Sequence, residues 1–172
     1  MQPNQSLKAV LWDMDGVLVD TFDGHYLAWQ QTMDELQQPF NLEMFTKTFG
    51  MNNHLILTTV FKRELDEDFI QQVSDRKEVL FRKSIKNSVK LLPGVEDWLI
   101  RFRDLGLKQA VASSAPQENI TALLDEFAIG NYFGAEAAGA TIQGKPDPAV
   151  FLLAASRLEV SPQDCLVIED SV

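Results

Sequence analysis

Two kinds of hydrophobic pattern divide the sequence. From about residue 21 to residue 89, apolar side chains such as Tyr26, Trp29 and Met33 recur at intervals of three and four, which predicts helices. In the rest of the chain, short unbroken apolar runs, typical of buried parallel strands, alternate with helical stretches. The predicted strands that contain these runs are residues 7–12, 108–112, 132–135 and 166–168, and the helical stretches are residues 93–105, 116–127 and 148–158.

The alternation of strands and helices predicts an α/β fold with a Rossmann-like parallel sheet and right-handed crossovers. Residues 21–89 lack such alternation and read as an inserted helical unit. We therefore expect a discontinuous core domain of residues 1–20 and 90–172, with an α-helical domain of residues 21–89 inserted into it.

Polar side chains come directly after three of the predicted strands. Ligands of open parallel sheets bind beyond the carboxyl ends of the strands, so these side chains should meet at one rim. A carboxylate at the end of a buried strand needs a cation or hydrogen-bond donors, and hard oxygen ligands suit Mg²⁺. The three groups are Asp13 with Asp15, Ser113 with Ser114, and Glu169 with Asp170.

The first of these groups carries a resemblance to a known family. Asp-Met-Asp-Gly at residues 13–16, continued by Val-Leu-Val-Asp-Thr, resembles the first motif of the haloacid dehalogenase superfamily. Ser113, Lys145 in Gly-Lys-Pro-Asp-Pro, and Glu169-Asp170 resemble the second, third and fourth motifs, in the family's order. The helical insert between the first two motifs matches members that carry a small α-helical cap.

The resemblance implies that Asp13 is a nucleophile that attacks phosphorus and that Asp15 is a general acid and base. It also implies an Mg²⁺ cofactor held by Asp13, Glu169 and Asp170 together with Asp15, which contributes its main-chain carbonyl. Adjacent residues leaving a strand diverge, so we expect Asp170 rather than Glu169 to be the direct ligand.

Four further residues are candidates for binding the phosphate or the substrate. The resemblance assigns Ser113 and Lys145 to the transferring phosphoryl group, and Ser114 is a second hydroxyl beside it. Ser114 with Gln117 also forms a Ser-x-x-Gln capping box, and we expect its side chain to cap the helix that follows. His25 reads equally well as a substrate contact or as a polar residue at a helix start.

At closer range the chain resembles the β-phosphoglucomutase and sugar-phosphatase subgroup, through the spacing of Asp20-Thr21, His25 and Trp29. The mutases carry a cap arginine that grips a second phosphate, and the corresponding position here is Asn53. Because Asn cannot clamp a dianion, this difference favours hydrolysis. A basic cluster could substitute for that arginine, although such a run usually forms a solvated helix face. It comprises Arg76, Lys77, Arg82, Lys83, Lys86 and Lys90.

The resemblance implies an Mg²⁺-dependent phosphatase that hydrolyses small phosphorylated metabolites, such as sugar phosphates, through an aspartyl-phosphate. Two alternatives stay open: a β-phosphoglucomutase-type phosphomutase and a non-catalytic module that retains the fold. The formal net charge of −10 argues against nucleic acid as a partner.

The remaining features concern the setting of the protein. A single cysteine, Cys165, and the lack of a signal-like segment favour a reducing, cytoplasmic location. No run is long enough for a membrane span, so we expect no membrane partner. The family core usually continues beyond the fourth motif, whereas this sequence stops at Val172. We therefore expect a truncated core with an exposed strand edge.

Overall fold

A computed structural model describes residues 7–170, apart from the side chain of Asn87. Its strands are β1 (Ala9–Trp12), β2 (Val19–Asp20), β3 (Lys90–Leu91), β4 (Lys108–Ser113), β5 (Ala135–Ala138) and β6 (Cys165–Ile168). Its α-helices are α1 (Phe22–Glu35), α2 (Leu42–Thr48), α3 (Asn53–Phe61), α4 (Glu67–Ser88), α5 (Val95–Asp104), α6 (Gln117–Glu126) and α7 (Ala149–Arg157). Two 3₁₀ turns, η1 (Gly130–Tyr132) and η2 (Pro162–Asp164), complete the described elements.

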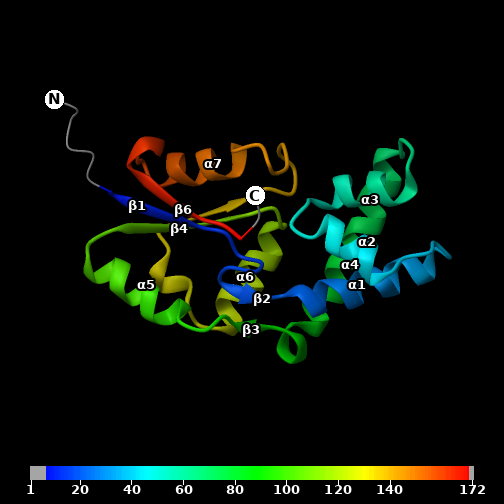
Figure 1. Ribbon diagram of the computed structural model, residues 1–172, viewed down its shortest axis with the longest axis horizontal. Coiled ribbons are helices and arrows are strands. Elements are labelled where there is room, and N and C mark those ends of the chain that lie inside the picture. Colours follow the sequence, from blue (N-terminus) through cyan, green and yellow to red (C-terminus); the bar gives the residue numbers. More distant parts are fainter. Residues whose placement is uncertain (1–6, 171–172) are drawn as a thin grey trace.

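Four parallel strands form the central sheet in the order β5-β4-β1-β6 (Figure 1). Helix α7 packs on one face, and α5 and α6 lie on the other. The predicted α/β class and parallel core are therefore confirmed. β6 is an edge strand, and Leu166 and Val167 on it are 40% and 43% exposed.

The side chains of β1 alternate between two hydrophobic clusters. Val10 and Trp12 pack among residues of α5 and α6, whereas Ala9 and Leu11 pack against α7. Successive side chains on a strand point to opposite faces, so a four-residue apolar run fills both layers at once. The run ends at Trp12, so Asp13 is the first residue beyond the strand.

Helices α1–α4 form a separate bundle at one end of the sheet (Figure 1). Their apolar faces share a third cluster centred on Trp29, Phe45 and Leu57. The short strands β2 and β3 pair antiparallel on the two connections between bundle and core, with Val19 opposite Leu91 and Asp20 opposite Lys90. We propose residues 21–89 as a cap domain inserted at this ribbon, as the sequence predicted.

The sequence misplaced one strand and missed one helix. The strand predicted at residues 132–135 lies at Ala135–Ala138 instead, and η1 occupies Gly130–Tyr132. The β5 sequence Ala-Glu-Ala-Ala has little strand propensity, and its pairing with β4 makes it a strand. Helix α2 went unpredicted because seven residues carry too little periodicity, and the Asn41 side chain that caps it accepts from the Met44 N–H.

Within residues 7–170, no helix combines the length and the apolar character that crossing a membrane requires.

Candidate active site

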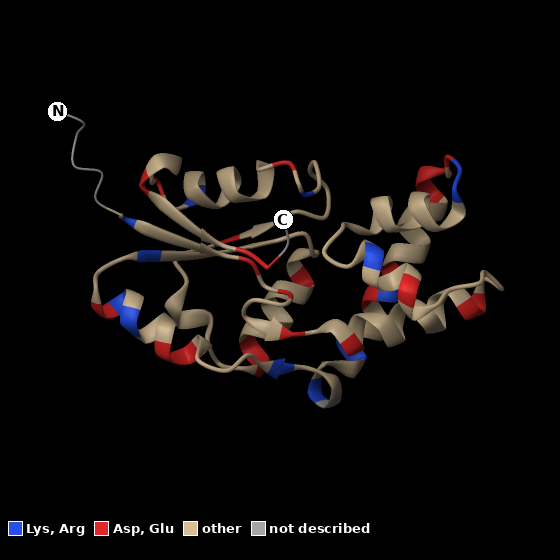
Figure 2. Ribbon diagram, in the orientation of Figure 1, with Lys and Arg blue, Asp and Glu red and all other residues tan. Residues whose placement is uncertain are grey.

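The register of the sheet brings the ends of β1 and β6 together. Trp12 lies opposite Ile168, and the Asp13 N–H donates to the Ile168 carbonyl at 2.9 Å. Asp13 therefore emerges beside Glu169, and the ribbon in Figure 2 is acidic where β6 ends. The predicted convergence of acidic groups at one rim is confirmed for β1 and β6.

Asp13 is a buried carboxylate, with 4% of its surface exposed. Lys145 Nζ lies 2.7 Å from Asp13 Oδ1 and 2.6 Å from Glu169 Oε2, so one ammonium forms ion pairs with two carboxylates. Burial raises the pKa of Asp13 to about 7; the charge of Lys145 lowers it, and the charges of Asp15 and Glu169 raise it. Around Asp13, negatively charged side chains therefore outnumber positively charged ones.

Lys145 is held between these carboxylates rather than in solvent. Burial alone would lower the pKa of Lys145, but the charges and hydrogen bonds of Asp13 and Glu169 raise it above its usual value. Its ammonium also lies 5.2 Å from the centre of the Phe151 ring. Lys145 is therefore a fixed cation between Asp13 and Glu169.

Oxygen atoms of Asp13, Glu169 and Asp170 lie within 4.8 Å of one another. Burial raises the pKa of Asp170, and the charge of Glu169 raises it further. Gly16 has a φ of +83°, and a Cβ at that position would overlap the Asp170 carboxylate. Among the described residues, three hard oxygen donors beside one lysine suit a divalent ion such as Mg²⁺.

The carboxylate of Asp15 faces away from this acidic group. Its Oδ1 accepts hydrogen bonds from Thr21 Oγ1 at 2.6 Å and from His25 Nε2 at 3.2 Å. Burial would raise the pKa of Asp15, but His25, Thr21 and the charge of Lys77 lower it to about 2. Of the four predicted metal residues, Asp15 is the one whose side chain lies elsewhere, which leaves its main-chain carbonyl as the predicted ligand.

His25 links Asp15 to the helical bundle. Its ring stacks on Phe81 at 3.7 Å between centres, and its Nδ1 lies 2.9 Å from Lys77 Nζ. His25 thus bridges Asp15, through Nε2, and Lys77, through Nδ1.

Lys77 begins a buried polar network between α4 and the core. Lys77 and Glu78 are 3% and 4% exposed and form an ion pair of 2.9 Å. Glu78 also accepts from Asn53 of α3 at 2.8 Å and from Asn119 of α6 at 2.5 Å. The expectation of a solvated basic face is therefore wrong for Lys77, because its partners are internal.

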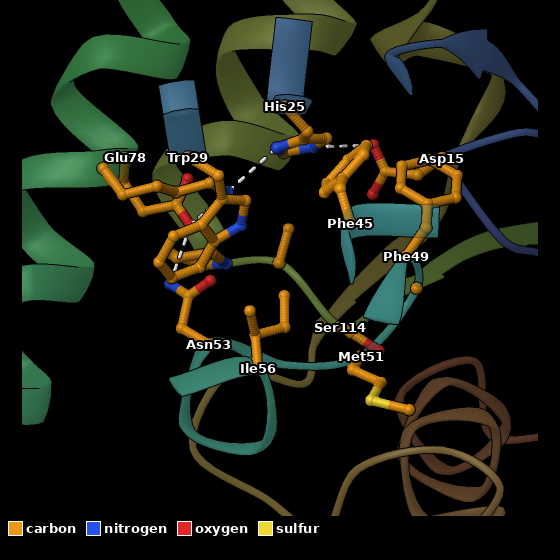
Figure 3. A pocket seen from close by; sticks show the side chains of 14 residues that line it. Asp15, His25, Trp29, Phe45, Phe49, Met51, Asn53, Ile56, Glu78 and Ser114 are labelled. Carbon is orange, nitrogen blue, oxygen red and sulfur yellow. Dashed lines mark hydrogen bonds and ion pairs between the residues drawn. The ribbon is translucent and has the colours of Figure 1, made fainter. Parts of the chain in front are cut away.

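A pocket opens beside Asp15, between the bundle and the loop after β4 (Figure 3). Asp15, His25, Asn53, Glu78 and Ser114 contribute its polar lining. Apolar side chains, among them Trp29, Phe45, Phe49, Met51 and Ile56, line much of the remainder.

The structure corrects one prediction about the two serines, the capping role of Ser114. The capping box is wrong: α6 begins at Gln117 with Pro116 as its N-cap, and no side chain caps it. Ser113 is fully buried, and its Oγ accepts from the Ala115 N–H at 3.1 Å. Ser114 instead lines the pocket. The turn formed by Ser113 thus replaces the expected cap and turns Ser114 toward the cavity.

Sequence reasoning missed the roles of Lys77, Glu78 and Asn119 in this network. A signal for Lys77 was present, because it follows the buried residues Ile70 and Val73 at helical spacing and precedes Phe81 by four. A charged residue in phase with a buried face needs an internal partner. Asn119 had no such local signal.

The sequence was then compared with known proteins. Residues 7–172 match the family described as haloacid dehalogenase-like hydrolase. A β-phosphoglucomutase of Bacillus subtilis is 32% identical over 96% of this chain and 76% of that protein. A phosphorylated carbohydrates phosphatase of Thermotoga maritima is 28% identical over 96% of this chain and 77% of that protein.

A solved structure shows the same similarity at the level of the fold. A crystal structure of a β-phosphoglucomutase from Clostridium difficile superposes with a TM-score of 0.86 and 25% identity. The superposition covers 96% of this chain and 77% of that one.

Proposed function

Because the chain belongs to the haloacid dehalogenase-like hydrolases, we propose that it is an Mg²⁺-dependent phosphatase of small phosphorylated metabolites. The observation that carries the proposal is the contrast at residues 13–15. Asp13 lies with Lys145, Glu169 and Asp170, and Asp15 faces His25 and the pocket. A nucleophile and an acid–base group on two sides of one phosphate site suit phosphoryl transfer through a covalent intermediate.

Asp13, Glu169 and Asp170 would hold the Mg²⁺. When bound, the ion would offset negative charge on the phosphate and on the carboxylates around it. Lys145, fixed 2.7 Å from Asp13 Oδ1, supports both the nucleophile and the phosphate oxygens. Ser113 and Ser114, at the end of β4, are the proposed phosphate-binding hydroxyls.

In the first step, the Asp13 carboxylate attacks phosphorus, the bond to the ester oxygen breaks, and an aspartyl-phosphate forms. Asp15 gives the departing oxygen a proton, and a nearby phosphate dianion favours its neutral form by like-charge repulsion. In the second step, Asp15 takes a proton from the attacking water, and the phosphate leaves Asp13. His25 and Thr21 hold the Asp15 carboxylate in position throughout.

Asn53 supports hydrolysis over transfer to a second sugar. It lines the pocket and its amide donates to Glu78, so this position offers no positive charge. A phosphomutase remains the second candidate, because the B. subtilis relative that is 32% identical is a β-phosphoglucomutase.

The test is phosphate release from p-nitrophenyl phosphate and a panel of sugar phosphates, with and without Mg²⁺. We expect release that requires Mg²⁺ and disappears in Asp13→Asn, but persists in Asp125→Asn, which alters an exposed residue on α6. Turnover retained by Asp13→Asn would remove Asp13 as the nucleophile.

A second assay separates hydrolysis from transfer. With β-glucose 1-phosphate and a trace of the bisphosphate, formation of glucose 6-phosphate without free phosphate would replace the phosphatase by the mutase. A protein that binds Mg²⁺ but turns over nothing would favour the non-catalytic module.

A further inference from the structure

Five side chains form a continuous series of polar contacts that begins and ends on the core and passes through the helical bundle. Asp15, in the loop after β1, meets His25 of α1, and His25 meets Lys77 of α4. Lys77 pairs with its neighbour Glu78, which in turn accepts a hydrogen bond from Asn119 of α6. A movement of the bundle away from the core would therefore break this series at both ends.

The two carboxylate oxygens of Glu78 have different partners. Oε1 accepts from Lys77 at 2.9 Å and from Asn53 at 2.8 Å, and both donors belong to the bundle. Oε2 accepts from Asn119 Nδ2 at 2.5 Å. The bundle itself thus fixes the carboxylate and directs one of its oxygens at the core.

Asn119 also binds a second side chain of the same helix. It is fully buried, and its Oδ1 accepts from Arg82 Nη1 at 2.8 Å. Glu78 and Arg82 lie one helical turn apart, so α4 presents an acceptor and a donor to a single amide. Only one orientation of that amide satisfies both partners, which ties α4 to α6 at one point along each helix.

Asn119 has no local role that would explain its burial in α6. No side chain caps this helix, and among the described residues both hydrogen-bond partners of the Asn119 amide lie on α4. A buried amide lowers stability unless its hydrogen bonds are made. Its place in the fold is therefore accounted for by the bundle and not by the helix that carries it.

The bundle meets the core at a second place, beside Lys145. A Cβ on Gly144 would lie 2.9 Å from Asn52 Nδ2 and 3.0 Å from Leu55 Cδ1. The start of α3 therefore lies directly against the loop that carries Lys145. The position of the bundle on the core thus affects the surroundings of both Asp15 and Lys145.

We propose that Asn119 is a positioning residue: by binding Glu78 and Arg82, it holds the helical bundle in place on the core and so shapes the pocket beside Asp15. The inference rests on the proposed phosphatase function, because it concerns the same site. A substrate that needs the bundle in place binds more weakly in proportion to the fraction of molecules in which the bundle is displaced.

An exchange of donor and acceptor tests the contact. Asn119→Asp sets a carboxylate against Glu78, and Glu78→Gln sets a donor against other donors whichever way its amide turns. In the double variant, the new amide on α4 can donate to the new carboxylate on α6, which still accepts from Arg82. The double variant also has the net charge of the original chain, so it should restore what each single change loses.

Kinetics with two substrates measure the effect on the site. Acetyl phosphate is small and has a good leaving group, whereas the sugar phosphate hydrolysed fastest in the panel above carries a group large enough to contact the bundle. We expect each single variant to lower kcat/KM for the sugar phosphate at least about tenfold, mainly through KM, and for acetyl phosphate less than about twofold. Asn131→Asp makes the same change at an exposed residue of η1 and should alter neither value.

A distance measurement needs no turnover. Spin labels at Leu27→Cys on α1 and Leu152→Cys on α7, in a Cys165→Ser background, join the bundle to the core, and the two leucines are 54% and 47% exposed. We expect Asn119→Asp and Glu78→Gln to broaden the distribution of distances between the labels. The double variant and Asn131→Asp should give the distribution of the original chain.

The outcomes separate the two proposals. A distance distribution unchanged in both single variants, or equal losses of kcat/KM on both substrates, would overturn the inference and leave the phosphatase standing. A double variant no better than the single variants would also overturn it. No phosphate release by the original chain from any compound would overturn the phosphatase and the positioning role with it, whatever the distances show.

Discussion

Two carboxylates on one loop, Asp13 and Asp15, behave in opposite ways. Both are largely buried, yet the pKa of Asp13 is raised to about 7 and that of Asp15 is lowered to about 2. Asp13 shares one ammonium with Glu169, whereas Asp15 receives two hydrogen bonds of its own. The partners that each side chain meets, rather than burial itself, decide its charge.

The contrast extends to the two regions around these residues. The region of Asp13 gathers three carboxylates around one lysine and is left short of positive charge. Around Asp15, the polar groups satisfy one another from His25 through Lys77 to Glu78. The first region suits an added cation, and the second suits a fixed proton-transfer group. The predictions below alter one region at a time.

The largest effect should come from Asp15→Asn. Removing the acid–base group should lower kcat/KM for a sugar phosphate about 10²–10⁴-fold. The loss should be smaller for p-nitrophenyl phosphate, whose leaving group needs little protonation. Steady-state kinetics on both substrates measure the difference, and an equal loss on both would contradict the acid role of Asp15.

Breaking the ion pair between Lys77 and Glu78, near Asp15, should lower the free energy of unfolding. Lys77→Met leaves Glu78 buried without its cation, and we expect a loss of about 3–5 kcal/mol in the free energy of unfolding. Lys83→Met, an exposed lysine on the same helix, should change it by less than about 0.5 kcal/mol. Urea unfolding compares the two, and equal small effects would show that the pair is not needed.

In the region of Asp13, the expected effect depends on pH. The pKa of Asp13 lies near 7 in the folded protein and near 3.8 when unfolded, so the folded state binds the proton more tightly. Its ionisation therefore costs stability as pH rises from about 4 to 7, and the full cost applies above 7. Without metal, Asp13→Asn should be more stable than the original chain at pH 8, on the order of 4 kcal/mol.

Urea unfolding in EDTA at pH 4.5 and pH 8 measures this gap, which should shrink at the lower pH. Asp125→Asn provides the control, because its exposed side chain lies on α6. A gap that grows as pH falls would contradict the raised pKa of Asp13.

The smallest effect on stability should come from changing either of two matched glycines, Gly16 and Gly94, to alanine. Gly16 and Gly94 both have a φ of +83°, but only at Gly16 would a Cβ meet Asp170. Each change to Ala should cost about 1–3 kcal/mol of backbone strain. Only Gly16→Ala should also lose the rise in melting temperature that Mg²⁺ gives, as thermal denaturation would measure. Retained stabilisation by Mg²⁺ in Gly16→Ala would argue against Asp170 as a ligand.

Much of the fold was readable because it rests on local patterns. The apolar run at β1, the glycine after α5 and the helical spacing of α1 and α4 lie within short segments, and each predicted its element. β5 and the ribbon of β2 with β3 were misplaced or missed, because pairing with a distant strand creates them. The roles of the site residues and the domain boundaries at residues 20 and 89 stay predictions.

The sequence by itself determined which carboxylates end the strands, since strand length and parallel order put Asp13, Glu169 and Asp170 at one rim. Only the tertiary structure decided the state of Asp15 and the character of the pocket. His25 meets Lys77, and Glu78 meets Asn119, across 52 and 41 residues of chain. Hydrogen bonds between such distant residues form only once the helices pack, so no local pattern encodes them.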